Sequence, residues 1–324
     1  MSEPLILVHG NCQAHVLAAV LAASGAGTVC ILHRVYGFRP SCFGVQPFIL
    51  SMEEAPATAE RISGYGRPVV LVEQATPLAP PLPADYLPGV PRIRFPHVQL
   101  QSWWPQNPDE QTPDRLRRFW NLDLASLRRS EAAAGLDTAL SAYIEQSAAE
   151  RPLFWMPVHP DLGVMRRLYG IICDGLRQFG DYGAENTLSS MPEMLDFYCE
   201  HPLRDDVVRG LGLSWAQDGW YRAWSEAVAA HRRGDDMASC ALHEQLLEQP
   251  DMSKHVWGSY GTALLSIGRN EDAHRAFGAA HRAFPHNSNY RALWVQTLSP
   301  TAIGSAEEPL IDMIADIYDP YRNG

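Results

Sequence analysis

The sequence predicts an α/β fold, an open and mostly parallel sheet with flanking helices, followed by an all-α tetratricopeptide-like helical region. Short continuous apolar runs recur through about the first 110 residues, which is typical of buried parallel strands. From residue 112 the apolar residues follow a helical period, and the last third of the chain carries an internal repeat. These three patterns favour two kinds of structure joined in one chain.

The first strand and helix are expected near the start of the chain. Residues 5–8 form an apolar run that ends at His9-Gly10-Asn11, and residues 14–23 are rich in Ala, Leu and Val. A strand, a tight turn and a helix are therefore predicted in that order. Further strands are predicted in three apolar runs, at residues 29–32, 69–72 and 92–95.

The segments between and after these strands also have recognisable patterns. Residues 52–63 suit a crossover helix, whereas the proline-rich segment 75–91 predicts an extended surface loop. Thr112 ahead of Pro113 predicts a helix start, and a second helix is expected around residues 138–148. Residues 153–160 resemble a strand that stops at a proline, and 161–179 an amphipathic helix.

The C-terminal third follows the helix-turn-helix pattern of a tetratricopeptide repeat, with small residues where two helices cross closely. The pattern is carried by Trp257, Gly261, Leu264, Ala273, Phe277, Ala280 and Pro285, and its second half recurs 35 residues earlier at Ala238, Leu242 and Pro250. We therefore predict four regions: an α/β domain at 1–110, a mostly helical continuation that completes the catalytic unit at 111–215, tetratricopeptide-like repeats at 216–298 and a tail helix at 299–324.

The charged residues restrict the partners and the chemistry. A formal net charge of -11 disfavours broad binding to nucleic acid or to an anionic membrane surface. Lys254 is the only lysine, so the lysine of a phosphate-binding P-loop is absent. Any bound phosphate must then be held by arginine or by backbone N–H groups.

The cysteines and the apolar segments indicate a compartment. The six cysteines show no Cys-x-x-Cys spacing, which favours a reduced protein, and we expect no metal site. The first residues lack the basic start and long apolar core of a signal peptide. No stretch approaches the roughly 20 apolar residues that span a bilayer. We therefore expect a cytoplasmic protein without a membrane span.

The sharpest candidate for chemistry is the segment Gly10-Asn11-Cys12-Gln13. Between a strand and a helix, Gly10 allows a tight turn, and the first N–H groups of the helix form an anion site. Cys12 at the positive helix end favours a thiolate, while Asn11 and Gln13 add amide donors for an oxyanion or for a bound cofactor. The alternative is that Cys12 is a small buried residue in a glycine turn.

The opening of the chain resembles the amino-terminal signature of the WcbI-like capsular polysaccharide biosynthesis family. The resemblance rests first on residues 7–13, Leu-Val-His-Gly-Asn-Cys-Gln, followed by a helix rich in Ala and Leu. The strand ending Val-Glu-Gln at 72–74, the segment Arg-Phe-Pro-His at 94–97 and Val-His-Pro at 158–160 follow in the expected order. It covers roughly residues 5–180 and excludes the tetratricopeptide-like region.

This resemblance implies an α/β protein that binds coenzyme A. In that family the activity is thought to be transfer of an acetyl group to a sugar hydroxyl during capsule assembly. For this chain we therefore expect acetyl-CoA as acyl donor, a sugar or glycoconjugate as acceptor and no metal. We also expect the tetratricopeptide-like region to bind a protein partner.

Two histidines are candidates for the general base. His97 follows a predicted strand and could face the same crevice as Cys12, or be a structural histidine beside an aromatic cluster. His159 precedes a predicted helix, and its alternative is a capping or packing role. Four further residues are predicted to bind substrate, the two tryptophans as a stacking wall: Gln74, Ser102, Trp103 and Trp104.

Two arginine pairs are candidates for holding phosphate. Arg166 and Arg167 lie early in the helix after His159, and we expect them to bind the cofactor together with the Gly10 segment. Arg92 and Arg94 flank the strand that leads to His97. Either pair is a solvated surface pair unless the fold brings it to the Gly10 turn.

Two other functions fit the same residues. An esterase-like (SGNH-like) hydrolase would use water in place of the sugar as acceptor. A non-catalytic scaffold would use the repeats to bind a peptide and tolerate loss of Cys12, His97 and His159 together. We rank the acyl-CoA-dependent transferase first, because the Gly10 segment and the resemblance point to it together.

Overall fold

The computed structural model of the chain describes two compact units, which are treated separately below. One unit comprises Met1–Phe197 with Leu203–Trp215, and the other comprises Tyr198–Pro202 with Ala216–Gly324. The described residues are 4–24, 27–33, 48–51, 62, 64, 66, 68–75, 82, 87–104, 112–137, 139–156, 159–179, 202–217, 219–249, 253–283 and 288–297.

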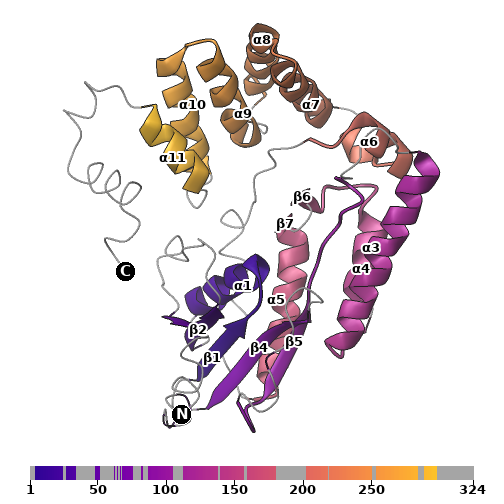
Figure 1. Cartoon of the computed structure of the whole chain (residues 1–324), viewed down its shortest axis with the longest axis vertical. Coiled ribbons are helices and arrows are strands. Elements are labelled where there is room, and N and C mark those ends of the chain that lie inside the picture. The colour runs from indigo at the N-terminus through magenta and orange to yellow at the C-terminus, as the bar shows by residue number, and fades with distance from the viewer. Residues whose placement is uncertain are drawn as a thin grey trace, which may run out of the picture. The chain divides into compact units, whose positions relative to one another are not determined.

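The first unit is built on a parallel sheet, which has five strands within the described residues (Figure 1). The strands are β1 (Leu5–His9), β2 (Thr28–His33), β3 (Phe48–Ser51), β4 (Val69–Ala75) and β5 (Arg92–Pro96). Their spatial order is β3-β2-β1-β4-β5, so the chain moves outward in one direction from β1 and then in the other from β4. In open α/β sheets, ligands bind beyond the carboxyl ends of the strands at such a switch point.

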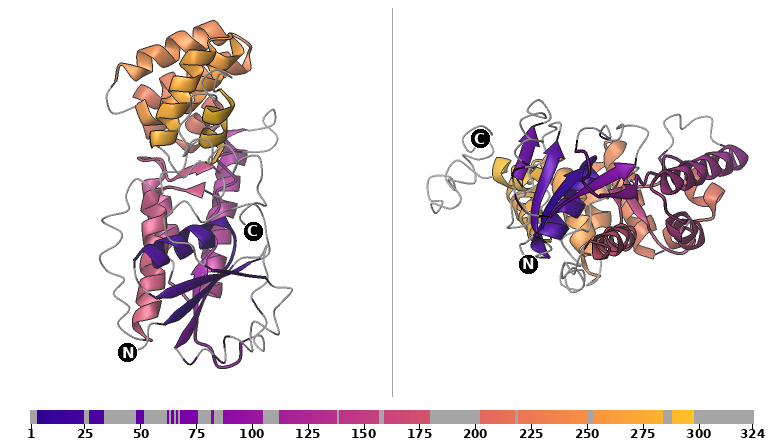
Figure 2. Two further views of the ribbon diagram at one scale, coloured as in Figure 1. Left: turned by 90° about the vertical axis from the view of Figure 1, so that its left-hand side faces the viewer. Right: turned by 90° about the horizontal axis from the view of Figure 1, so that it is seen from below.

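The two faces of the sheet are covered by different segments. Side chains alternate along each strand, so Val72 and Gln74 of β4 share one face and Leu71 and Glu73 the other. Helix α1 (Cys12–Ala23) and helix α5 (Leu162–Arg177) lie on the Gln74 face. Gly175 lets α5 approach closely, since a Cβ there would lie 2.6 Å from Ile93 of β5. The strands twist relative to one another, as Figure 2 shows.

The Leu71 face packs on residues that lie between the strands in the sequence. Its apolar side chains pack in one buried cluster with Ile62, Leu82 and Leu87. The described part of the proline-rich segment is therefore partly inserted into the core, with Leu82 4% and Leu87 2% exposed. The prediction of a surface loop is wrong for these two residues, because burying their apolar side chains lowers the free energy of the folded chain.

The remaining elements of the first unit follow the strands in sequence. They are the helices α3 (Pro113–Ala133), α4 (Ala139–Ser147) and α6 (Asp205–Leu211), and an antiparallel pair formed by β6 (Phe154–Met156) and β7 (His159–Pro160). A short 3₁₀ helix, Ser214–Ala216, comes after α6. The N-cap of α3 is Thr112, as predicted, and its hydroxyl accepts a hydrogen bond from the backbone N of Arg115 at 3.3 Å.

Helix α4 receives its N-terminal hydrogen bonds from a neighbouring helix. Glu131, near the end of α3, is 1% exposed, and its Oε1 accepts from the backbone N of Leu140 at 2.8 Å and of Ser141 at 3.2 Å. The carboxylate thus accepts hydrogen bonds from N–H groups that have no acceptor within their own helix. It also links the end of α3 to the start of α4.

The second unit is helical throughout its described part (Figure 1). Its helices are α7 (Gly219–Arg232), α8 (Asp236–Leu247), α9 (Ser253–Ser266), α10 (Asn270–Ala283) and α11 (Ser288–Gln296), and each packs on the next along the chain. Gly261 of α9 lies against the ring of Phe277 of α10, where a Cβ would be 2.8 Å from the ring. The two helices therefore cross closely at residues that the repeat pattern singled out.

A buried polar network joins three of these helices. The Nδ1 of His243 lies 2.8 Å from the carbonyl O of Ser239 and must donate to it, while its Nε2 lies 2.8 Å from the hydroxyl of Ser259. The indole of Trp224 donates to the same hydroxyl at 3.0 Å. Burial lowers the pKa of His243 to about 4, so the imidazole is neutral near pH 7.

The structure confirms a mixed α/β architecture with an open parallel sheet, and the apolar runs at 5–8, 29–32, 69–72 and 92–95 are all strands. The strand Phe48–Ser51 was not predicted. The tail helix at 299–324 and all of the crossover helix at 52–63 except Ile62 fall outside the described residues. None of the helices in the described ranges combines the length and the apolar character needed to cross a bilayer.

The buried cap of α4 predicts a difference between two glutamates of adjacent helices. Glu131→Ala leaves two buried N–H groups without an acceptor and should lower the free energy of unfolding of the first unit by about 1–3 kcal/mol. Glu145→Ala is the matched control, because Glu145 is exposed and its ion pair with Arg128 is worth at most about 1 kcal/mol. Urea denaturation followed by circular dichroism measures both changes, and equal losses would contradict the capping role.

The pKa of His243 predicts how the second unit responds to acid. Its folded-state pKa of about 4 lies below its ordinary value of 6.5, so the unfolded chain binds more protons between these values. Stability is therefore fully present above about pH 6.5 and falls by up to about 3 kcal/mol as the pH approaches 4. Thermal unfolding from pH 7 to 4 should show a steeper loss for the natural chain than for His243→Gln. Identical slopes would contradict the prediction.

Candidate functional site

The segment between β1 and α1 turns sharply at the switch point of the sheet. Gly10 follows β1, and a Cβ at this position would lie 2.7 Å from the Cβ atoms of both Ala14 and Gln74. Its φ of 157° also lies in the range that favours glycine. Both neighbouring atoms are attached directly to the backbone and cannot rotate away. The turn therefore requires glycine, and it places the start of α1 between the ends of β1 and β4.

Asn11 caps the helix that begins in this turn. Its side-chain oxygen accepts a hydrogen bond from the backbone N of Gln13 at 2.9 Å, and its own backbone N donates to Oε1 of Gln74 at 2.9 Å. The positive end of α1 thus lies at the switch point, where it favours an anion or a developing oxyanion. Cys12 is the first residue of α1, but its side chain lies outside the described part of the structure. Its role as nucleophile stays a prediction.

Gln13 and Gln74 form a buried amide pair that also binds the main chain at Val98. The Nε2 of Gln74 donates to Oε1 of Gln13 at 2.9 Å. The same Oε1 accepts from the backbone N of Val98 at 3.2 Å, and Nε2 of Gln13 donates to the carbonyl O of Val98 at 2.6 Å. The two glutamines are 2% and 1% exposed. They hold three segments together, and neither amide faces solvent as the predicted ligand-binding roles would require.

His97 immediately precedes Val98 in the sequence and is held through its main chain. Its backbone N lies 3.0 Å from both the carbonyl O of Ala75 and the hydroxyl of Ser130, so it donates to both. The imidazole is 7% exposed, and among the described residues its Nε2 has no hydrogen-bond partner. Buried polar atoms of proteins are seldom left in this state.

The burial of His97 also sets its protonation. Removal of the ring from water disfavours the imidazolium and lowers the pKa of His97 below its usual value of 6.5. The ring is therefore neutral near pH 7. A neutral imidazole is the form that a general base needs.

The aromatic residues after His97 are less open than predicted. Trp103 is 1% exposed, and its ring packs against those of Phe154 and Trp215 with centroids 6.1 Å and 5.7 Å away. Ser102 is likewise buried, and its backbone N donates to Asp123 at 2.7 Å. Burial raises the pKa of Asp123, although the hydrogen bonds from Ser102 oppose this shift. Of the predicted stacking wall only Trp104 is partly exposed.

The remaining predicted residues are not drawn together by the contacts of the described residues. His159 begins β7 and pairs with Met156, but its side chain falls outside the described atoms. Arg166 is exposed on α5, and the guanidinium of Arg167 lies over the ring of Tyr143 at 3.7 Å from its centroid. The roles of all three in catalysis or cofactor binding therefore remain predictions.

Sequence reasoning missed a buried charge on the opposite face of the same sheet edge. The side chain of Glu73 is fully buried, and its Oε1 accepts a hydrogen bond from the backbone N of Leu82 at 2.6 Å. Arg92 and Arg94 lie 3.6 Å and 3.4 Å from Oε2, and Nδ1 of His9 lies 4.0 Å from Oε1. The signal in the sequence is a glutamate at the end of an otherwise apolar strand.

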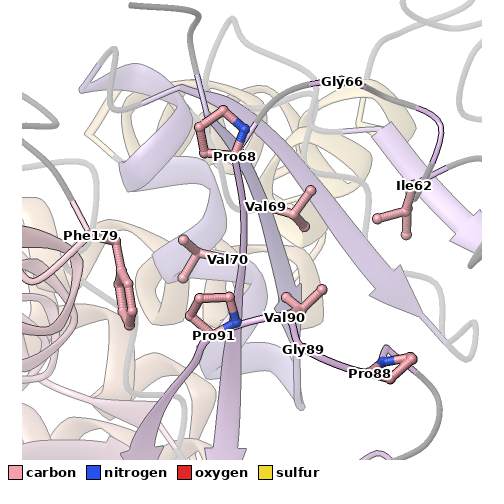
Figure 3. Close-up of a pocket in the computed structure, with 10 residues that line it drawn as sticks. All are labelled: Ile62, Gly66, Pro68, Val69, Val70, Pro88, Gly89, Val90, Pro91 and Phe179. Atoms are coloured by element: carbon pink, nitrogen blue, oxygen red, sulfur yellow. The ribbon is translucent and has the colours of Figure 1, made fainter.

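A hollow of about 510 Å³ lies at the amino ends of β4 and β5 (Figure 3). It is lined by Ile62, Gly66, Pro68, Val69, Val70, Pro88, Gly89, Val90, Pro91 and Phe179. Val69 begins β4 and Pro91 immediately precedes β5, so this hollow is at the amino ends of the strands, away from Gly10. None of these ten described lining residues has a titratable side chain.

The described residues contain no group of three or more His, Cys, Asp or Glu side chains arranged to hold a metal ion. Comparison with family models, with curated proteins and with solved structures gave no match for this chain. The site must therefore be assessed from its own geometry.

The close contacts of Gly10 predict a substitution effect. Gly10→Ala forces a Cβ against Ala14 and Gln74 and should destabilise the first unit by about 1–3 kcal/mol while displacing the start of α1. Gly170→Ala is the matched control within α5, since nothing lies within 4 Å of its added Cβ, and alanine favours the helix by up to about 1 kcal/mol. Thermal unfolding compares the two variants. A neutral effect of Gly10→Ala would show that the turn tolerates a side chain.

Proposed function

We propose that the protein is an O-acyltransferase that moves an acyl group, acetyl in the first instance, from coenzyme A to a sugar hydroxyl in polysaccharide or glycoconjugate synthesis. The observation that supports this most is the hydrogen bonding of Gln13 to Val98. It brings the helix end after β1 and the segment of His97 to one point at the carboxyl edge of the sheet. The resemblance in sequence supplies the substrate class.

The geometry supports His97 as the base. Its neutral imidazole would take the proton of the acceptor hydroxyl, whose oxygen then attacks the thioester carbonyl carbon. The negative charge that develops on the carbonyl oxygen would be stabilised by N–H groups at the start of α1. When the carbon–sulfur bond breaks, the departing thiolate takes the proton from the imidazolium. His159 is the alternative base in the same step.

Cys12 offers a second route to the same products. Its thiolate would attack the thioester first, releasing coenzyme A and leaving the acyl group on the sulfur, and the acceptor hydroxyl would then displace Cys12. The backbone position of Cys12 at the first turn of α1 supports this route, because a helix N-terminus favours thiolate over thiol.

The second unit is proposed to be a tetratricopeptide-like repeat that binds a protein partner or presents the acceptor. The close crossing of α9 and α10 at Gly261 and Phe277 supports this assignment. A cytoplasmic location belongs to the same proposal, since acyl-CoA donors are made there.

Transfer assays with acetyl-CoA and a panel of sugars test the function. His97→Asn should reduce kcat/KM by about 10²–10⁴ if His97 is the base, and Cys12→Ala should abolish turnover if the covalent route operates. Arg117→Gln, an exposed change on α3, is the control. Because burial lowers the pKa of His97, kcat/KM should hold its plateau below pH 6.5 and fall only at more acidic pH.

The outcomes distinguish the competing functions. Rapid hydrolysis of simple aryl esters without coenzyme A would instead identify a hydrolase. If the natural chain shows no turnover, and the triple variant lacking Cys12, His97 and His159 keeps every binding function that the natural chain has, the protein is a binding scaffold. Either result would refute the transferase.

A further inference from the structure

We propose that Arg94, with Arg92 and His9 beside it, forms a phosphate-binding subsite at the carboxyl edge of the sheet. The subsite lies on the face opposite α1 and would take a phosphoryl group. That this group belongs to coenzyme A rests on the proposed function, whereas the affinity for phosphate does not.

The strand register brings these residues to the Gly10 turn. His9 of β1 is the register partner of Glu73 of β4, and Glu73 is the partner of Arg94 of β5. In-register partners of neighbouring parallel strands point to the same face, with the strands about 4.8 Å apart. Arg94 therefore lies roughly 10 Å from His9, the residue that immediately precedes Gly10. This is the convergence that the sequence alone could not establish.

Glu73 and Arg92 also hold a neighbouring segment of main chain, at Leu82. The main chain of Leu82 donates its N–H to Glu73 and accepts a hydrogen bond from NH1 of Arg92 at 2.8 Å. The pair thereby fixes Leu82 on the sheet, and the guanidinium of Arg92 compensates the buried carboxylate. A buried charge without such a partner costs several kcal/mol.

Arg94 is not needed for this structural role. Its side chain is 42% exposed, and in the described part of the chain its one ion-pair contact is from Nε to Oε2 of Glu73 at 3.4 Å. Its guanidinium therefore places a positive charge at a partly exposed position, in a chain whose formal net charge is -11. A positive charge that is open to solvent attracts anions.

The chemistry of Arg94 suits phosphate. The contact of Nε with the buried carboxylate of Glu73 orients the guanidinium of Arg94. The two terminal nitrogens of the guanidinium can then bind two oxygens of one phosphate. The side chain of His9 is 15% exposed, and its Nδ1 lies 4.0 Å from Oε1 of Glu73, so it lies beside the same carboxylate as Arg94.

Isothermal titration calorimetry with three probes tests the subsite in the full chain. The probes are inorganic pyrophosphate, coenzyme A and pantetheine, which lacks the phosphates. Arg94→Gln should weaken pyrophosphate and coenzyme A by about tenfold or more and leave pantetheine unchanged. Arg117→Gln, an exposed arginine on α3, should change none of the three. The difference between natural chain and Arg94→Gln should shrink as salt rises, since an exposed charge is screened.

The probes separate this inference from the proposed function. Pyrophosphate binding that depends on Arg94, in a chain that binds neither coenzyme A nor pantetheine, would support the subsite and count against the transferase. Coenzyme A binding that is equal in Arg94→Gln and the natural chain would overturn the subsite and leave the transferase standing. Absence of pyrophosphate binding by the natural chain at low salt would also overturn the subsite.

Discussion

The structure of the candidate site depends on the buried hydrogen bonds among Gln13, Gln74 and the main chain of Val98. A buried amide must have partners for its oxygen and its nitrogen, and here each glutamine finds them on segments far away in sequence. The start of α1, the end of β4 and the chain after β5 are consequently fixed at one point. The positions of Asn11 and His97 follow from that constraint.

The carboxyl edge of the sheet has two chemically different faces. On the α1 face the polar groups are the amides of Gln13 and Gln74, with the helix end supplying partial positive charge. On the other face Arg92 and Arg94 lie 3.6 Å and 3.4 Å from the carboxylate of Glu73. A reaction that handles a neutral thioester carbonyl and an anionic carrier would use both faces. Because side chains alternate along β4, Gln74 on one face and Glu73 on the other are adjacent in the sequence.

Much of the fold was predictable, because continuous apolar runs mark buried parallel strands and Thr112 marks a helix start. The strand Phe48–Ser51 was missed, since a run this short resembles any buried segment. The tight turn at Gly10 was predictable, because a glycine between a strand and a helix indicates such a turn. The cap that Asn11 forms on α1 was not predicted. Glu73 was missed and Trp103 was misjudged, because their partners, Leu82 and Trp215, are brought in by tertiary contacts that spacing does not reveal.

The most direct test of the account is a nuclear magnetic resonance titration of the full chain with coenzyme A. The backbone amide signals of Asn11, Gln13, His97 and Val98 should shift together with one common dissociation constant, because one ligand meets both segments. Signals that stay unmoved there while others shift elsewhere, or separate dissociation constants for the two segments, would contradict it.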